Sequence, residues 1–238
     1  MRSAVGILFL TLFQFPNSQG QSPRRPPKPP ESPIEKIKVQ DNFNLNQFAG
    51  KWFLIGVASE CNYLKEHNFQ LEGTTIVVSQ DLTLEKKLPI STFRKLDGIC
   101  WEIKQEYKQD KVLGRFLLTV RGYGHKLNMV VANTDYSSYA ILYYQKQRTV
   151  SIKLYARSVT VNDDVITKYE NRVRELNIGE DFIYYFPKYG FCDSVDQFHI
   201  LNENTLTEKF MGTWGATVKK NPTLMPKEKT VGCLIFEL

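Results

Sequence analysis

Short runs of apolar residues recur along the middle of the chain, and turn-forming residues separate them. The clearest run covers residues 149–158, where Val150, Ile152, Leu154 and Ala156 alternate with polar or aromatic side chains. An alternation with a period of two is typical of a half-buried β-strand. Comparable β-rich runs occur at 48–58, 73–79, 91–96, 99–107, 114–120, 126–134 and 136–145. These strand signals, with no helical pattern between them, predict an all-β meander that closes into a barrel, because closure removes exposed strand edges.

One helix is predicted after the last of these strands. Asn162 is a favourable N-cap residue, and the acidic side chains of Asp163 and Asp164 suit the positive end of a helix dipole. Gly179 is expected to end the helix, and residues 183–186 are expected to form a short strand. Apolar residues recur at intervals of three and four, as on one face of a helix: Ile166, Tyr169, Val173 and Leu176.

The N-terminus has the composition of a secretory signal. Arg2 precedes an apolar run at residues 6–15, and the small residues Ser18 and Gly20 stand before a plausible cleavage site. The run is too short to span the roughly 30 Å of hydrocarbon in a bilayer. We therefore expect residues 1–20 to be a signal peptide and the mature protein to be secreted and extracellular, so that its cysteines are disulfide candidates.

Composition divides the rest of the chain into three parts. Residues 21–33 hold six of the 11 prolines, which predicts that residues 21–40 form a flexible arm, either a plain linker or a docking arm. Residues 41–202 hold the strand and helix signals, and residues 203–238 show no usable period, so a weakly structured tail is expected. The net charge of +6 comes mostly from the ends, since 41–202 carries 20 basic and 19 acidic residues. The barrel therefore lacks a basic stripe, and nucleic-acid binding is not expected.

Three motifs, in the same order as the predicted elements, resemble those of the lipocalin family. They are Gly50-Lys51-Trp52, Thr134-Asp135-Tyr136 and Arg157. The resemblance implies an eight-stranded antiparallel up-and-down barrel with one C-terminal helix and a short extra strand. Trp52 would plug one end, with the Arg157 guanidinium across its indole, and Gly50 would allow a close approach of backbones. Asp135 would accept hydrogen bonds from turn amides, so these motif residues are expected to be structural.

Longer stretches resemble the lipocalins of the complement system. They are residues 91–101, 112–118, 153–158 and 185–192. This resemblance implies a non-enzymatic subunit of the eighth complement component that is accessory to the membrane attack complex. Its covalent partner would be the alpha chain of that component, and through it the beta chain. After about His199 the chain departs from this resemblance.

Four cysteines, Cys61, Cys100, Cys192 and Cys233, allow three full pairings. The family resemblance implies that Cys100 and Cys192 bond within the chain, and that Cys61 bonds the alpha chain of the eighth complement component. An internal bond between Cys61 and Cys233 remains the alternative. The residues expected to contact the partner belong to the loop 59–73: Cys61, Asn62, Tyr63, Leu64, His67 and Phe69.

No residue pattern in the sequence indicates catalysis. The three histidines, His67, His125 and His199, lack the spacing of metal ligands, and no hydrolase or metalloprotease motif occurs. We therefore expect neither an enzyme nor a cofactor or metal, and no direct insertion into a membrane. The alternative function is an extracellular carrier of a small hydrophobic ligand in the barrel cavity. Three aromatic residues are candidates for either the core or the cavity wall: Phe116, Tyr139 and Tyr143.

Overall fold

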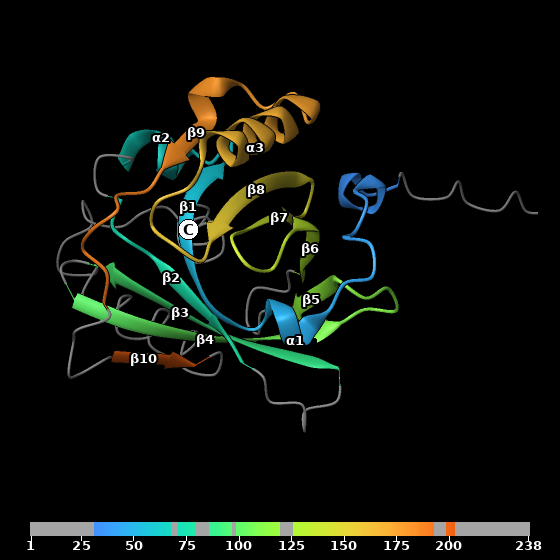
Figure 1. Ribbon diagram of the computed structural model, residues 1–238, viewed down its shortest axis with the longest axis horizontal. Coiled ribbons are helices and arrows are strands. Elements are labelled where there is room, and N and C mark those ends of the chain that lie inside the picture. Colours follow the sequence, from blue (N-terminus) through green and yellow to red (C-terminus); the bar gives the residue numbers. More distant parts are fainter. Residues whose placement is uncertain are drawn as a thin grey trace, which may run out of the picture. The chain divides into compact units, whose positions relative to one another are not determined.

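Eight antiparallel strands form a closed sheet in the computed structural model, which describes residues 31–67, 71–79, 86–96, 99–119, 126–192 and 199–202 (Figure 1). Each strand pairs with the next, and β8 pairs with β1, which closes the barrel. The predicted lipocalin-type barrel is therefore confirmed. The strands are β1 (Gly50–Ala58), β2 (Thr75–Val78), β3 (Lys87–Leu96), β4 (Ile99–Gln109), β5 (Arg115–Thr119), β6 (Lys126–Thr134), β7 (Tyr139–Lys146) and β8 (Thr149–Ala156).

The two ends of the barrel differ in how the chain covers them. Helix α1 (Leu45–Phe48) leads into β1 at one end, and α2 (Asn62–His67) follows β1 at the other (Figure 1). The sequence predicted a loop over residues 59–73, so α2 is a correction to that prediction. Six residues are too few for a stable isolated helix. The packing of the fully buried Leu64 side chain against the rest of the protein therefore stabilises α2.

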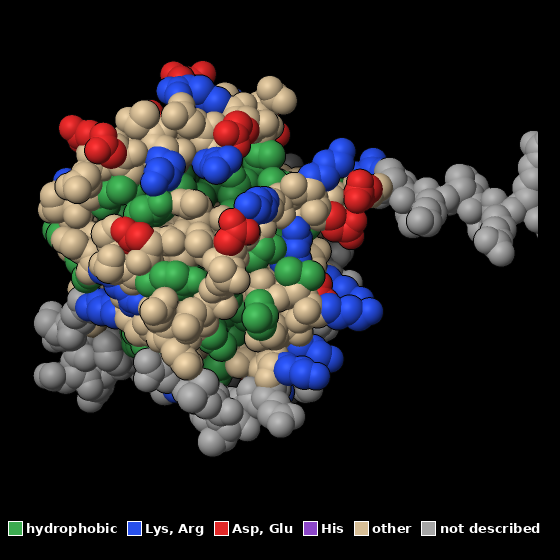
Figure 2. All heavy atoms as spheres, turned by 45° about the vertical axis from the view of Figure 1, so that its right-hand side comes forward, with side chains coloured by type: hydrophobic (Ala, Val, Ile, Leu, Met, Phe, Trp, Pro, Cys, Tyr) green, Lys and Arg blue, Asp and Glu red, His purple; other side chains and the backbone are tan. Residues whose placement is uncertain are grey.

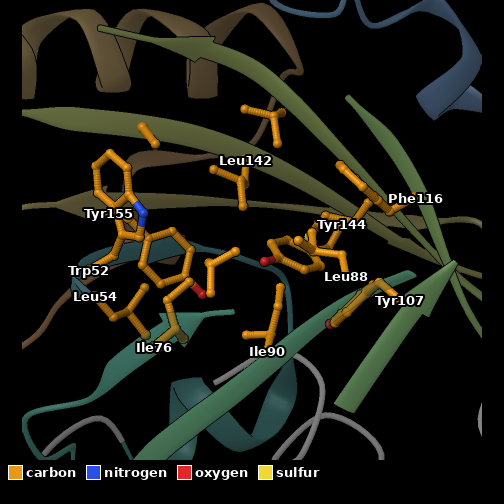
Figure 3. Packing of buried hydrophobic residues seen from close by; sticks show 14 of the residues in the cluster. Trp52, Leu54, Ile76, Leu88, Ile90, Tyr107, Phe116, Leu142, Tyr144 and Tyr155 are labelled. Carbon is orange, nitrogen blue, oxygen red and sulfur yellow. The ribbon is translucent and has the colours of Figure 1, made fainter. Parts of the chain in front are cut away.

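Hydrophobic clusters lie on both sides of the sheet, and this explains the alternation in β8. Tyr155 faces the barrel interior, whereas Ile152 and Leu154 pack outside the barrel. Phe116 belongs to the interior cluster, while Tyr139 and Tyr143 belong to the outer one. Figure 3 shows side chains of the interior cluster facing one another: Trp52, Leu54, Ile76, Leu88, Ile90, Tyr107, Phe116, Leu142, Tyr144 and Tyr155.

Helix α3 (Asp163–Glu175) covers the outer cluster. Tyr169 and Val173 from the predicted apolar face are fully buried, and Asn162 is the N-cap residue. The predicted end at Gly179 was wrong. The helix stops at Glu175, and Asn177 takes the left-handed conformation with φ 56°. Asparagine tolerates this conformation better than most residues, so it can act where glycine was expected.

Two further elements follow α3. A 3-10 turn, η3 (Glu180–Phe182), leads into β9 (Ile183–Tyr185), which pairs antiparallel with β1. Strand β10 (His199–Asn202) pairs parallel with β4, a pairing that the sequence did not predict (Figure 1). None of the helices in the described part of the chain is both long and apolar enough to cross a membrane.

The last part of the predicted flexible arm packs against the barrel. Residues 33–36 form a 3-10 turn, η1 (Pro33–Lys36), and Ile34 is buried. The Gln145 side-chain oxygen accepts hydrogen bonds from the Ser32 hydroxyl and the Ile34 N–H group. The Arg115 guanidinium donates to the carbonyls of Ile34, Glu35 and Ile37. The predicted boundary at residue 40 is therefore too late, while residues 1–30 and the tail 203–238 lie outside the described residues.

Alkaline solution is expected to destabilise the barrel because tyrosines are buried in it. Burial raises the pKa of Tyr143 to about 12 and raises the pKa of Tyr144 and Tyr155 above the ordinary value. Above about pH 10 the unfolded chain loses these protons first, so each tyrosine lowers the free energy of unfolding by about 1.4 kcal/mol per pH unit until the folded form also ionises. Stability should therefore be intact below about pH 10 and fall as the pH rises toward about 12.

Urea unfolding at a series of pH values, with tyrosinate absorbance in parallel, measures this loss. A Tyr143→Phe variant should lose stability less steeply than the parent. Tyr189 is 77% exposed, so Tyr189→Phe is the matched control and should follow the parent. Identical pH dependence in the parent and in Tyr143→Phe would contradict the assignment.

Candidate functional site

Arg157 and Trp52 organise the end of the barrel where α1 enters. The guanidinium carbon of Arg157 lies 3.6 Å from the centroid of the Trp52 ring, and Trp52 is fully buried. The indole N–H of Trp52 donates to the Phe48 carbonyl at 2.8 Å. The Arg157 side chain also donates to backbone carbonyls of α1, β1 and the turn before β7, at 2.8–3.4 Å: those of Gln47, Phe48, Ala49, Lys51 and Tyr136. These contacts close this end of the barrel.

The Thr134-Asp135-Tyr136 motif shapes the turn between β6 and β7. Asp135 accepts hydrogen bonds from the backbone N–H groups of Ser138 and Tyr139 and from the Ser138 hydroxyl. Burial opposes the ionisation of Asp135, but these hydrogen bonds outweigh it and lower the pKa of the carboxyl. Thr134 Oγ1 donates to the Tyr139 carbonyl at 2.7 Å and accepts from the Tyr136 N–H group. The motif therefore fixes the turn between β6 and β7.

Gly50→Ala is expected to lower the free energy of unfolding by about 1–3 kcal/mol. Gly50 has φ +96°, which L side chains rarely adopt, and a Cβ there would lie 3.2 Å from Arg157 Nη1. Thermal or urea unfolding of the variant measures the loss. Gly179→Ala is the matched control, because Gly179 has φ −63° and its Cβ would meet the Phe182 ring at an ordinary 3.5 Å. Equal stability of the two variants would contradict the role of Gly50.

Cys61 lies at the opposite end of the barrel, directly before α2. Its N–H group donates to the Ser59 hydroxyl, and its carbonyl accepts from the Lys65 N–H group. The Ser59 N–H group in turn donates to the Phe182 carbonyl of η3. Cys61 is only 8% exposed and belongs to the interior cluster together with Leu64. The local backbone is therefore fixed, and the sulfur is largely covered.

The residues of the loop 59–73 that were predicted to contact a partner do not all occupy the same kind of position in the structure. Asn62, Tyr63 and His67 lie on α2, and Phe69 lies outside the described residues. Leu64 is fully buried, so its side chain holds α2 on the barrel and is not available to a partner. The predicted loop is therefore a short helix anchored by Leu64, with Cys61 at its start.

The cysteines are all oxidised in the part of the chain that the structure describes. Cys100 on β4 and Cys192 form a disulfide with a Cα–Cα distance of 5.7 Å. Phe191, beside Cys192, packs edge-on against Phe53 of β1 with ring centroids 5.1 Å apart. Cys61 is also disulfide-bonded.

The barrel interior contains a buried lysine that the sequence pattern did not identify. Lys153 of β8 is 4% exposed, and its Nζ lies 4.4 Å from the centroid of the Tyr144 ring. The signal was present in the alternation of β8, because Lys153 shares a face with Tyr155. The alternation did not say which face of β8 points inward, and the structure places the face of Lys153 and Tyr155 inside the barrel. The interior thus combines apolar walls with a buried lysine side chain.

No cluster of His, Cys, Asp and Glu with the arrangement of a metal site occurs among the described residues. Basic and acidic side chains are interspersed with apolar ones on the face shown in Figure 2. The candidate functional groups at the end of the barrel that carries α2 are Cys61, α2 and the barrel interior.

The closed barrel, helix α3 and the Arg157–Trp52 pair define a lipocalin. A match to the Lipocalin / cytosolic fatty-acid binding protein family model covers residues 49–190, and the chain belongs to this family. It is 44% identical to the complement component C8 gamma chain of Oryctolagus cuniculus, over 77% of this chain and 87% of that one.

More distant similarities extend to other lipocalins. The chain is 28% identical to protein AMBP of Mus musculus over 68% of its own length, and it spans 48% of that protein. The solved siderocalin Ex-FABP superposes with a TM-score of 0.52 at 19% identity, covering 60% of this chain and 96% of that one. At this identity the solved structure supports the fold alone.

Proposed function

We propose that the chain is a non-enzymatic, extracellular lipocalin subunit of the eighth complement component, accessory to the membrane attack complex. The observation that carries this proposal is the 44% identity to the complement component C8 gamma chain, which extends over 87% of that chain. Such identity extends over 183 residues and is not confined to the family motifs. The secretory signal predicted at residues 1–20 agrees with an extracellular location.

The end of the barrel that carries α2 is the proposed partner-binding site. Cys61 would form the covalent bond to the alpha chain, and the exposed parts of α2 and the following loop would supply noncovalent contacts. Hydrogen bonds to Ser59 and from Lys65 hold the backbone of Cys61 in place. Once one bond joins two chains, their remaining contacts form at a high effective concentration, so a modest noncovalent surface suffices.

Co-expression in a secretory host tests the proposal. The full chain is produced with and without the alpha chain of the eighth complement component. The disulfide-linked peptides in nonreduced digests are then identified by mass spectrometry. The expected result is a peptide containing Cys61 linked to an alpha-chain peptide. Cys61→Ser should lose the covalent adduct, whereas Lys65→Ser, an exposed position on α2, should keep it. Absence of both covalent and noncovalent association with the alpha chain would overturn the proposal.

Carriage of a small ligand is the second candidate, and the barrel interior favours it. The buried Lys153 beside Tyr144 supplies a polar anchor among apolar walls, a combination typical of small-molecule sites. Organic extraction of the secreted chain followed by mass spectrometry tests this function. A ligand recovered equally from the parent and from Cys61→Ser would support carriage, and a chain recovered without ligand from serum-containing medium would argue against it.

A further inference from the structure

We infer that a groove on the side of the barrel docks an extended segment of a second partner protein. The groove has a volume of about 300 Å³ and is lined by β1, the link between β8 and α3, the start of α3 and the segment that follows β9. Ile55, Val161, Ile166 and Phe186 are among the apolar side chains of its wall. Ile55 and Ile166 also pack against the outer hydrophobic cluster, so the groove lies outside the barrel. A concave and mostly apolar surface of this size is typical of a recognition site.

The walls of the groove are held in place by contacts between elements. The Phe186 N–H group donates to the Ile55 carbonyl of β1 at 2.9 Å. The Tyr185 hydroxyl of β9 donates to Glu170 of α3 at 2.8 Å, and β9 lies beside α3 in Figure 1. These bonds join the two sides of the groove to each other and to the barrel. A preformed site reduces the ordering cost that binding would otherwise carry.

Main-chain groups along one wall of the groove are available to a partner. Val159 and Val161, two positions apart in the link between β8 and α3, both line the groove and are both partly exposed. Within the described part of the chain, the backbone N–H and C=O groups of these two residues form no hydrogen bond. An extended segment can pair with such groups as an added strand does, while its alternate side chains enter an apolar groove.

Asp163 and Lys188 place opposite charges on the groove. Both side chains are exposed, and neither forms an ion pair with another described residue. Asp164 follows Asp163 and adds a second exposed carboxylate at the start of α3. An uncharged apolar molecule such as a lipid tail would complement neither charge. A peptide segment can place a basic residue near Asp163 and an acidic residue near Lys188, with apolar side chains between them, and this arrangement also fixes its direction.

Exposed tyrosines border the groove. Tyr185 lines it and is 45% exposed, and Tyr189, next to Lys188, is 77% exposed. Tyrosines often contribute much of the binding energy at protein interfaces. Cys61 lies at the end of the barrel that carries α2, whereas the groove lies on the side of the barrel, so both sites can be occupied together. The chain would then link its covalent partner to another protein.

The test uses the full secreted chain and a library of random seven-residue peptides displayed on phage. The enriched peptides should carry a basic and an acidic residue on either side of apolar residues. Fluorescein-labelled synthetic copies should bind the parent, and Val161→Trp, which fills the groove, should weaken binding by at least about tenfold. Lys188→Glu should also weaken binding, and exchange of the acidic residue of the peptide for lysine should restore it. Lys36→Glu on η1 makes the same charge change at another exposed position and is the matched control, which should bind as the parent does.

The circular dichroism spectrum and thermal unfolding of each variant establish that it is folded. An absence of enriched peptides, or binding that is unchanged in both Val161→Trp and Lys188→Glu, would overturn the inference. Enriched peptides without the pair of opposite charges would overturn it as well. Cys61→Ser should bind the peptides as the parent does, because the groove acts without the covalent bond. A loss of peptide binding in Cys61→Ser would show that the two sites are not independent.

Discussion

Arg157→Ala should lower the free energy of unfolding by about 3–4 kcal/mol, because it removes charge-assisted hydrogen bonds and a cation–π contact together. The guanidinium is the donor to the carbonyls of α1, β1 and the turn before β7, so its loss leaves these acceptors without their partner. The Trp52 ring also loses the cation that covers it at 3.6 Å. In a domain of this size the loss corresponds to a fall in Tm of roughly 10 °C.

Urea unfolding followed by tryptophan fluorescence and far-UV circular dichroism measures the change. Arg157→Lys should recover only part of the stability, because an ammonium group cannot span several carbonyls as the planar guanidinium does. Arg172→Ala is the matched control, since Arg172 lies on the exposed side of α3 and pairs with Glu175. This variant should change stability by no more than about 0.5 kcal/mol. If Arg157→Ala lowers the free energy of unfolding by less than about 1 kcal/mol, the Arg157 side chain is not needed to hold α1 at the end of the barrel.

Removal of the Cys100–Cys192 disulfide should cost about 4–5 kcal/mol in the chain-entropy model. The bond closes a loop of 92 residues, and the unfolded chain gains the freedom of that whole loop when the bond is absent. The bond also holds the segment that ends at Cys192 against β4, where β10 subsequently pairs. The expected effect therefore includes a loss of protection from hydrogen exchange along this side of β4.

The comparison is made in a parent that carries Cys61→Ser and Cys233→Ser, so that no second disulfide changes at the same time. Cys100→Ala with Cys192→Ala is then compared with this parent by urea unfolding. Treatment of the parent with a strong reductant should reproduce the variant. If the double variant loses less than about 1 kcal/mol, native packing and not the crosslink determines the stability of this region.

The sequence predicted the order and type of nearly all barrel elements. Alternating apolar positions identify β8 because successive side chains point to opposite faces of a strand. The pattern does not say which face points inward, since the apolar residues Ile152 and Leu154 pack under α3 while Lys153 and Tyr155 face the interior. A sheet that is covered on both sides buries both of its faces. The hydrophobicity of a residue then does not reveal whether its side chain points into the barrel or away from it.

The motif residues were identified from the sequence alone, but their contacts required the fold. Gly50, Trp52 and Arg157 are separated by up to 107 positions in the chain, and β1 and β8 become neighbours only when the barrel closes. The buried Lys153 was missed because a lysine on an alternating strand ordinarily faces solvent. Its position depends on the closure of the barrel around it.

The sequence by itself determined the all-β meander, the position of α3 and the residues of the lipocalin motifs, because local periodicity and short motifs encode them. Only the tertiary structure decided the packing of residues 32–40 on Arg115 and Gln145, the short helix α2 and the end of α3 at Glu175. These features depend on partners far away in the chain, such as the core around Leu64. A pattern of neighbouring residues in the sequence cannot predict a contact that forms only when distant strands come together.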